Sequence, residues 1–204
     1  DEFFVLWQCG TPQPTVPGAT AYFRVPVQKA AVTSTTYMPY FEMIGERASL
    51  VAYTSTFDFV SSPCLRRMYR DGLINDTHIP DDVELTIADE WTIGSVPYGY
   101  AMSDTHEDSV LKVAEYVEVV GLFFNREHEA TQAIDHIIDG YTCIRDALAA
   151  QLEPKTVVLA GYVSSADAFS IASCPNWYCE VVEAAGGEIV EFQGVGAVEM
   201  WGYP

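Results

Sequence analysis

The sequence predicts an α/β fold in which parallel strands alternate with helices, and two observations carry this prediction. Between residues 28 and 53, a short apolar stretch, a helical pattern and a second short apolar stretch follow one another. Further on, the β-branched segment 155–161 ends at a glycine and precedes a helical pattern over 176–185. Strands that alternate with helices in this way are typical of parallel sheets flanked by helices.

The longest regular pattern covers residues 105–151, where apolar residues recur at helical spacing. One helix of that length would reach about 70 Å at about 1.5 Å per residue, further than a compact domain of this size needs. Asn125 tolerates the left-handed conformation in which helices end. We therefore expect one helix over 105–124 and a second over 127–151.

Local signals place the ends of the remaining elements. Thr105 and Asp108 form a capping-box-like start for the first long helix, and Pro154 closes the second. Ser62 and Pro63 open a short helix that ends at Asp71-Gly72. Residues 10–18 are rich in proline and glycine and exclude regular structure, and residues 96–101 are loop-like. We expect strands over 3–9, 20–25, 28–33, 50–53, 83–87 and 188–192, and a helix over 36–44.

The composition narrows the class of function. Of the 204 residues, 49% are hydrophobic, which is ample for a core, while 29 acidic and 10 basic residues give a net charge of −19. Such a charge repels nucleic acid and anionic lipid, so nucleic-acid binding is disfavoured. No run approaches the ~18 apolar residues of a membrane span, which disfavours direct membrane insertion. The start lacks the basic flank of a signal peptide, so an exported protein would be in its mature form here.

Five cysteines leave at least one thiol without a partner inside the chain. Cys174 and Cys179 bracket a short loop that a disulfide can close if their Cα atoms come within about 7 Å. Cys9 and Cys64 are a second candidate pair, and Cys143, within a predicted helix, is the expected free thiol. The spacings do not match a zinc site, so we expect no metal.

Several of these segments resemble one known family. The two long helices with their break, "PKTVVLAGY" at 154–162, the Trp177-Tyr178 pair and "EAAGGEIV" at 183–190 are similar to the helical-backbone (class III) periplasmic solute-binding proteins. Residues 30–46 resemble the strand, Ser/Thr turn and helix of that family, and "ASLVAYTS" at 48–55 resembles its second strand. Members of this family capture siderophores, haem and vitamin B12.

The resemblance implies a two-lobed architecture. It places an N-terminal α/β lobe at 1–104, a single spacer helix at 105–124 and a C-terminal α/β lobe at 125–204. Residues 195–204 resemble a strand after which the family's chain continues, so we expect a short or incomplete second lobe.

Ligands of an open parallel sheet bind beyond the carboxyl ends of its strands. This rule selects the loops 34–37, 54–57 and 161–165, whose hydroxyls and amides can hold an oxygen-rich or anionic ligand between aromatic walls. These residue types also have a purely structural interpretation, in which the serines and threonines cap helices and the aromatic side chains fill the core. The candidate ligand-binding residues are Thr35, Thr36, Tyr37, Thr54, Ser55, Phe57, Gly161, Tyr162, Ser164, Trp177 and Trp201.

Two further features concern charge and catalysis. Arg66, Arg67 and Arg70 form the one dense basic patch of the sequence, either a solvated helix face or a contact for an anion or partner. His128 and His136 lie two turns apart on a predicted helix, too far to bind one metal. The sequence lacks the G-x-S-x-G, phosphate-loop and dinucleotide-binding motifs, so we expect no catalytic residues.

The resemblance therefore implies non-catalytic capture of an iron chelate, haem or cobalamin-like ligand between two lobes, without a cofactor. It also implies a secreted, periplasmic or organelle-lumen location and a membrane transporter or larger assembly as partner. The alternative is a structural or accessory subunit that uses the same fold with a degenerate cleft.

Overall fold

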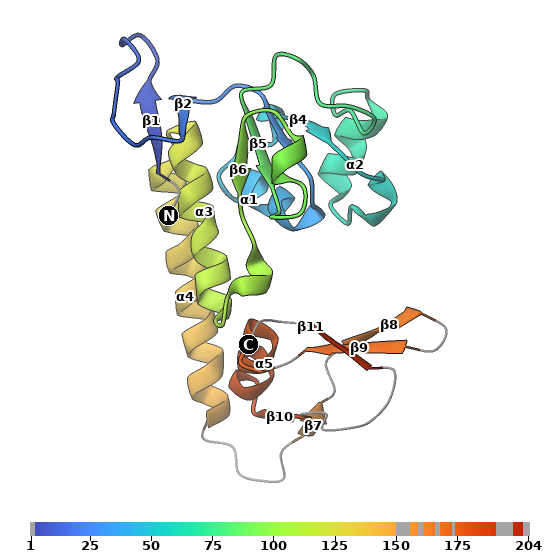
Figure 1. Cartoon of the computed structure of the whole chain (residues 1–204). Helices are drawn as coiled ribbons and strands as arrows, with labels where there is room; N and C mark the ends of the chain where they lie inside the picture. Colours follow the sequence, from blue (N-terminus) through green and yellow to red (C-terminus); the bar gives the residue numbers. More distant parts are fainter. Residues whose placement is uncertain are drawn as a thin grey trace. The chain divides into compact units, whose positions relative to one another are not determined.

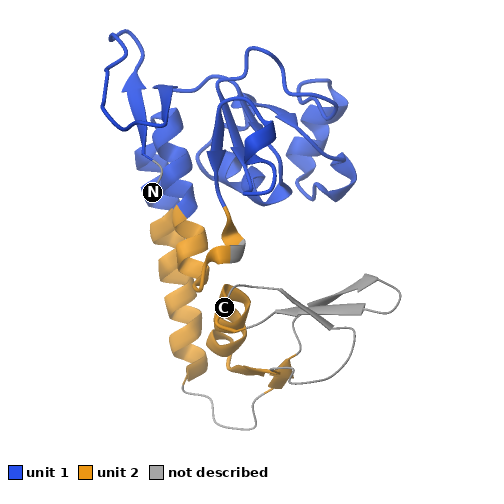
Figure 2. Ribbon diagram, viewed as in Figure 1, with its two compact units in different colours: residues 1–102, 116–133 blue, residues 103–115, 134–204 orange. Residues whose placement is uncertain are grey.

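Figure 1 shows the chain as a computed structural model, which describes residues 3–149, 156–158, 161–165, 168–172, 174–190 and 198–201. The packing divides it into two compact units (Figure 2). Unit 1 consists of residues 1–102 and 116–133, and unit 2 consists of residues 103–115 and 134–204. The lobes expected at 1–104 and 125–204, and their spacer, stay a prediction.

Unit 1 contains a four-stranded, fully parallel sheet, which confirms the predicted α/β class. Its strands are β3 (Ala30–Val32), β4 (Leu50–Tyr53), β5 (Leu85–Ala88) and β6 (Gly99–Ala101), in the order β4-β3-β5-β6. Every residue of β3 and β5 is buried, as expected for the central strands of a sheet covered on both faces. The strand β6 lies where the sequence predicted a loop.

Two short helices follow the predicted pattern closely. The helix α1 (Met38–Met43) continues a 3₁₀ turn, η1 (Thr35–Tyr37). The helix α2 (Pro63–Arg70) begins at Ser62, whose hydroxyl accepts a hydrogen bond from the Leu65 amide at 3.3 Å. It ends before Gly72, whose positive φ of 76° is the conformation that glycine adopts without strain.

A separate two-stranded parallel sheet, β1 (Phe4–Gln8) with β2 (Ala21–Val25), packs on the C-terminal end of the first long helix, α3 (Val110–Phe124). The ring of Phe123 lies 6.1 Å from Phe4 and 5.2 Å from Phe23, centroid to centroid. The carbonyl of Phe123 also accepts a hydrogen bond from the Val27 amide at 2.8 Å. Aromatic contacts of this kind help to join residues 116–133 to unit 1.

The predicted break between the long helices is confirmed. The helix α3 (Val110–Phe124) ends at Asn125, which has a φ of 54°, and α4 (Glu127–Ala149) follows. The Arg126 amide donates to the Gly121 carbonyl at 2.9 Å, the bond that closes a helix beyond a left-handed residue. The side chain of Asn125 also exchanges two hydrogen bonds of 3.1 Å with Gln8.

The expected start of the first long helix is wrong by several residues. Residues Asp104–His106 form a 3₁₀ turn, η5, and Glu107 is extended, which separates that turn from α3. Ser109 caps α3 instead, because its hydroxyl accepts a hydrogen bond from the Leu111 amide at 3.3 Å. The capping box assigned to Thr105 and Asp108 is therefore replaced by a single serine cap.

In unit 2, short strands accompany α5 (Trp177–Ala184). The strands β7 (Thr156–Val158) and β10 (Gly187–Ile189) pair in parallel, while β8 (Gly161–Ser165) and β9 (Ala168–Ala172) form an antiparallel hairpin. The strand β11 (Val198–Trp201) pairs in parallel with β9. Residues 161–165 are thus a strand and not the predicted loop. Tyr162 and Val163 are residue types that favour strands, and the glycine at 161 does not end one.

The cysteine chemistry is partly as expected. Cys174 and Cys179 form a disulfide with a Cα–Cα distance of 6.0 Å, so this prediction is confirmed. Cys9 and Cys64 are not paired: both are exposed free thiols, one after β1 and the other on the outer face of α2. Cys143 is a free thiol on α4, as predicted.

Candidate functional site

The strand order of unit 1 defines a place where ligands bind in proteins of this architecture. The chain forms β3, then β4 on one side of it, and then crosses to form β5 on the other side. In open parallel sheets, ligands bind beyond the carboxyl ends of the two strands at which the chain changes direction in this way, which here are β3 and β5. Residues 33–37 follow β3 and residues 89–92 follow β5, so these two loops border the candidate site.

Side-chain hydrogen bonds tie the two loops together. The hydroxyl of Thr92 lies 2.8 Å from an oxygen of Asp89 and 3.1 Å from the hydroxyl of Thr33. The Thr33 hydroxyl lies 3.5 Å from the other Asp89 oxygen, at the limit of a hydrogen bond. We call these three residues the Thr33–Asp89–Thr92 network. It supplies hydroxyl and carboxylate oxygens at the end of the sheet.

Asp89 also fixes the shape of its own loop. Its carboxylate accepts hydrogen bonds from the backbone amides of Trp91 at 3.1 Å and Thr92 at 2.9 Å. The turn leaves the Trp91 side chain 71% exposed beside the network. An exposed tryptophan presents a large flat apolar face to solvent, and such faces often mark contacts with a ligand. Sequence reasoning missed Asp89, Trp91 and Thr92, although the strand-end rule, applied to the expected strand 83–87, points to this loop.

The predicted loop 34–37 lies at this edge of the sheet. The Ser34 hydroxyl accepts a hydrogen bond from the Thr36 amide at 3.2 Å and donates to the Thr36 hydroxyl at 3.1 Å. Thr35 and Thr36 are half-buried. Tyr37 is only 2% exposed, and its hydroxyl donates to the Met102 carbonyl, just beyond β6, at 2.7 Å. Tyr37 thereby joins two strand ends from within the core, and its role as a ligand wall stays a prediction.

The predicted loop 54–57 follows β4. Thr54 and Ser55 are exposed, and the Thr54 amide donates to the Val32 carbonyl at 3.2 Å, which joins the ends of β4 and β3. Phe57 is 5% exposed and packs against Tyr53 and Tyr69. Thr54 and Ser55 are therefore accessible, whereas Phe57 contributes to the core.

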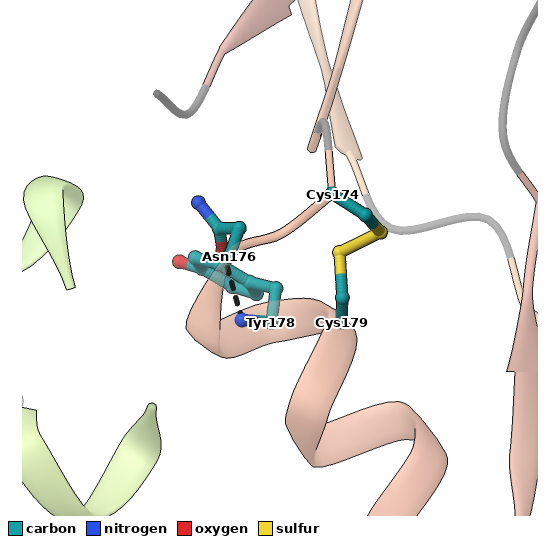
Figure 3. The surroundings of a disulfide bond; sticks show 4 residues. All are labelled: Cys174, Asn176, Tyr178 and Cys179. Carbon is teal, nitrogen blue, oxygen red and sulfur yellow. Dashed lines mark hydrogen bonds between the residues drawn. A yellow bond between two sulfur atoms is a disulfide. The ribbon is translucent and has the colours of Figure 1, made fainter. Parts of the chain in front are cut away.

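The remaining candidate residues belong to unit 2. Gly161, Tyr162 and Ser164 lie in β8, and Trp201 ends β11. Trp177 opens α5 after Asn176, whose side-chain oxygen accepts a hydrogen bond from the Tyr178 amide at 2.8 Å (Figure 3). The indole of Trp177 stacks on the ring of Tyr178, with 3.7 Å between centroids. Burial raises the pKa of Tyr178, and the nearby Asp104 carboxylate adds to this effect.

The described residues lack two features that would bear on function. Among them, no three His, Cys, Asp or Glu side chains lie where they could hold a metal ion together. None of their helices combines the length and apolar character that crossing a membrane requires. The hydroxyl and carboxylate groups of the Thr33–Asp89–Thr92 network are suited to forming hydrogen bonds with a ligand.

Comparison with known proteins shows the fold. No model of a protein family matches the sequence, and no curated protein matches it. The structure is nevertheless similar to class III periplasmic solute-binding proteins over about 84% of the chain. The sequence identities are low, so this likeness concerns the fold and does not identify a ligand.

Three solved structures illustrate the likeness. A substrate-binding protein of an ABC transporter from Listeria monocytogenes EGD-e has 16% identity and a TM-score of 0.59, covering 84% of this chain and 68% of that one. The siderophore-binding protein BauB, bound to two acinetobactin molecules and ferric iron, has 15% identity and a TM-score of 0.62, covering 85% and 65%. IsdE from S. aureus, complexed with heme, has 16% identity and a TM-score of 0.57, covering 84% and 68%. The chain spans between 58% and 70% of the length of structures of this kind.

Proposed function

We propose that the protein is a non-catalytic solute-binding protein that captures an iron chelate, haem or a cobalamin-like compound. The observation that carries the proposal is the fold, which is shared with proteins solved with a ferric siderophore and with heme. We further propose an extracytoplasmic location and a membrane transporter as partner. The similar ABC transporter substrate-binding protein and periplasmic binding proteins support both.

The chemistry of the sheet edge supports the same class of ligand. Chelates, haem and corrins combine flat apolar surface with oxygen atoms that form hydrogen bonds. Trp91 offers a flat exposed ring, and the hydroxyls of Thr33, Thr36 and Thr92 lie in the adjoining loops. We propose that these residues are the contribution of unit 1 to ligand binding.

A second candidate function is an accessory subunit in an extracellular or organelle-lumen assembly. One observation favours it: Tyr37 and Phe57, two of the aromatic residues expected to face the ligand, are buried in the core. A fold that no longer binds a solute has no need for aromatic side chains at the sheet edge. The exposed Trp91 favours solute binding instead, so a substitution of this residue best separates the two functions.

The test is a thermal-shift screen of ferric siderophores, haem and cobalamins with the intact chain. A compound that binds only the folded protein adds about 2.7 kcal/mol of stability at one hundred times its dissociation constant. We expect Trp91→Ala to weaken binding of that compound by on the order of tenfold, because a stacked aromatic contact is lost. Phe3→Ala is the matched control, since Phe3 is also exposed but lies outside the sheet edge.

The outcomes separate the two functions. A shift that Trp91→Ala reduces and Phe3→Ala leaves unchanged supports solute binding at the sheet edge. If none of the compounds raises the melting temperature, solute capture of this class is ruled out and the accessory function is favoured.

A further inference from the structure

A pocket of about 340 Å³ lies between the 3₁₀ turn η3 (Phe57–Phe59) and the helix α2. This volume is at the lower end of the range of about 300–1,000 Å³ that small-molecule pockets occupy. None of the residues of the Thr33–Asp89–Thr92 network lines it. We call it the η3–α2 pocket. Its lining residues are Phe57, Asp58, Pro63, Arg66, Tyr69 and Arg70.

One part of the pocket is lined by apolar rings. The rings of Phe57 and Tyr69 lie parallel, with 4.1 Å between centroids and 2° between planes. The Tyr69 hydroxyl donates to the Asp76 carboxylate at 2.6 Å, which holds the ring in place. Pro63, the first residue of α2, adds a second rigid surface. The two stacked rings cover each other's inner faces, and Phe57 is only 5% exposed, so the wall that a ligand can touch consists of Pro63 and the outer side of the stack. An apolar wall of this kind suits a planar group.

The polar part of the pocket is positively charged. Arg66 and Arg70 are four residues apart, so they extend from the same face of α2. Arg67 does not line the pocket and is paired with Asp71 at 2.7 Å. Within the part of the chain that the structure describes, neither Arg66 nor Arg70 has an acidic partner; Arg66 reaches only the Val60 carbonyl, at 3.4 Å. Among the described residues that line the pocket, Asp58 is the one acidic residue, which leaves an excess of one positive charge.

This local excess of positive charge contrasts with the net charge of −19 of the whole chain. Guanidinium groups bind carboxylates with paired, charge-assisted hydrogen bonds, and they also stack on flat rings. We propose that the η3–α2 pocket binds a small planar organic anion. The carboxylate of this anion lies against Arg66 and Arg70, and its ring lies against Pro63 and the outer side of the Phe57–Tyr69 stack.

Three probes separate the parts of this proposal in titrations of the intact chain followed by NMR or calorimetry. Benzoate carries both a ring and a carboxylate, benzamide is its neutral counterpart, and inorganic phosphate is an anion without a ring. We expect benzoate to bind at least tenfold more tightly than either of the others, because it alone uses the guanidinium groups and the wall together.

The arginines of α2 provide the variants and their control. Arg66→Gln and Arg70→Gln should each weaken benzoate binding at least fivefold, whereas Arg67→Gln removes the same charge from the same helix and should leave it unchanged. All three side chains are exposed, so the variants should keep the melting temperature of the parent within a few degrees. The proposal is overturned if benzoate fails to bind below about 10 mM, a free energy of about −2.7 kcal/mol. It is also overturned if phosphate or benzamide binds equally well, or if Arg67→Gln has the same effect as the other two. It does not depend on the proposed function, since a chelate bound at the sheet edge leaves these results unaltered.

Discussion

At the scale of single residues, Asn125 decides how the long helical segment is divided. Its φ of 54° is a conformation that costs an ordinary L-residue about 1–2 kcal/mol. Asparagine tolerates this conformation better than most residues and here also bonds to Gln8. This is why the break could be predicted from the sequence: the signal is one residue type at one position.

Two substitutions at this position separate the contribution of the backbone conformation to stability from that of the side-chain hydrogen bonds. Asn125→Ala and Asn125→Gly both lose the hydrogen bonds to Gln8, but glycine adopts a positive φ without strain. We expect Asn125→Ala to lower the free energy of unfolding by about 1–2 kcal/mol more than Asn125→Gly. Urea unfolding curves measure the difference. Equal losses would mean that the left-handed conformation carries no cost here.

Asp104 gives a prediction about pH. Burial raises the pKa of this carboxyl above its ordinary value. The folded chain therefore holds the Asp104 proton more tightly than the unfolded chain does, so this group lowers stability as the pH rises through its folded pKa. Asp104→Asn, which cannot ionise, should raise the melting temperature at pH 7 and have a smaller effect at pH 3. Asp146→Asn, at an exposed ion-paired carboxylate, is the control and should give no such gain. A gain from Asp104→Asn that is independent of pH would exclude ionisation as its cause.

At the scale of elements, α3 and α4 approach each other closely just beside their connection. A Cβ atom at Gly121 would come within 2.7 Å of the Cβ of Ala130, whereas one at Gly140, on α4, would meet nothing within 4 Å. We expect Gly121→Ala to destabilise by about 1–3 kcal/mol through overpacking. Gly140→Ala should stabilise by up to about 1 kcal/mol, because alanine favours a helix. Thermal unfolding of both variants is the measurement, and a stabilising Gly121→Ala would show that the helices can move apart at no cost.

The disulfide at the start of α5 yields a second prediction at this scale. It closes a short loop, so its removal should cost about 2 kcal/mol of stability through the entropy of the unfolded chain. The double variant Cys174→Ser with Cys179→Ser tests this in chemical unfolding. Alkylation of the unfolded chain should label three cysteines without reductant and five with it. Five labelled cysteines without reductant would contradict the disulfide.

Some helices and strands can be predicted from the sequence and others cannot. The strand β4 and the helix α2 were predicted because their signals are local: a β-branched or apolar run, and Ser-Pro before a helical pattern. The strand β6 has three residues and follows Tyr98, which has a φ of 49°; only its pairing with β5 makes it a strand. Pairing with a distant segment is invisible to a local pattern.

The candidate site, too, can be predicted only where its residues follow a local pattern. The sequence predicts the loops after β3 and β4 because each follows a predicted strand. It does not predict the Thr33–Asp89–Thr92 network, because this network joins residues 56 and 59 positions apart in the chain. Only the strand order brings β3 and β5 together, and no spacing within either segment predicts that order.

At the scale of the whole molecule, the net charge of −19 influences stability as well as partners. Like charges repel one another more in the compact state than in the extended chain. Salt screens this repulsion, and the Debye length falls from about 30 Å at 0.01 M to about 10 Å at 0.1 M. We therefore expect the melting temperature to rise by a few degrees between 10 and 150 mM NaCl. Glucose at matched osmolality is the control, and a melting temperature that falls with salt would show that ion pairs outweigh the repulsion.

Unit 1 is built from two separate segments of the chain, and this has a consequence for the synthesis of the protein. The phenyl rings of Phe4 and Phe23 are covered by Phe123, and residues 116–133 belong to the same compact unit as residues 1–102. A growing chain that has emerged only as far as residue 102 therefore still lacks the helix against which its first strands pack. During synthesis, this apolar surface stays uncovered until residues 116–133 have appeared. For that interval the nascent chain exposes apolar surface of the kind that promotes aggregation.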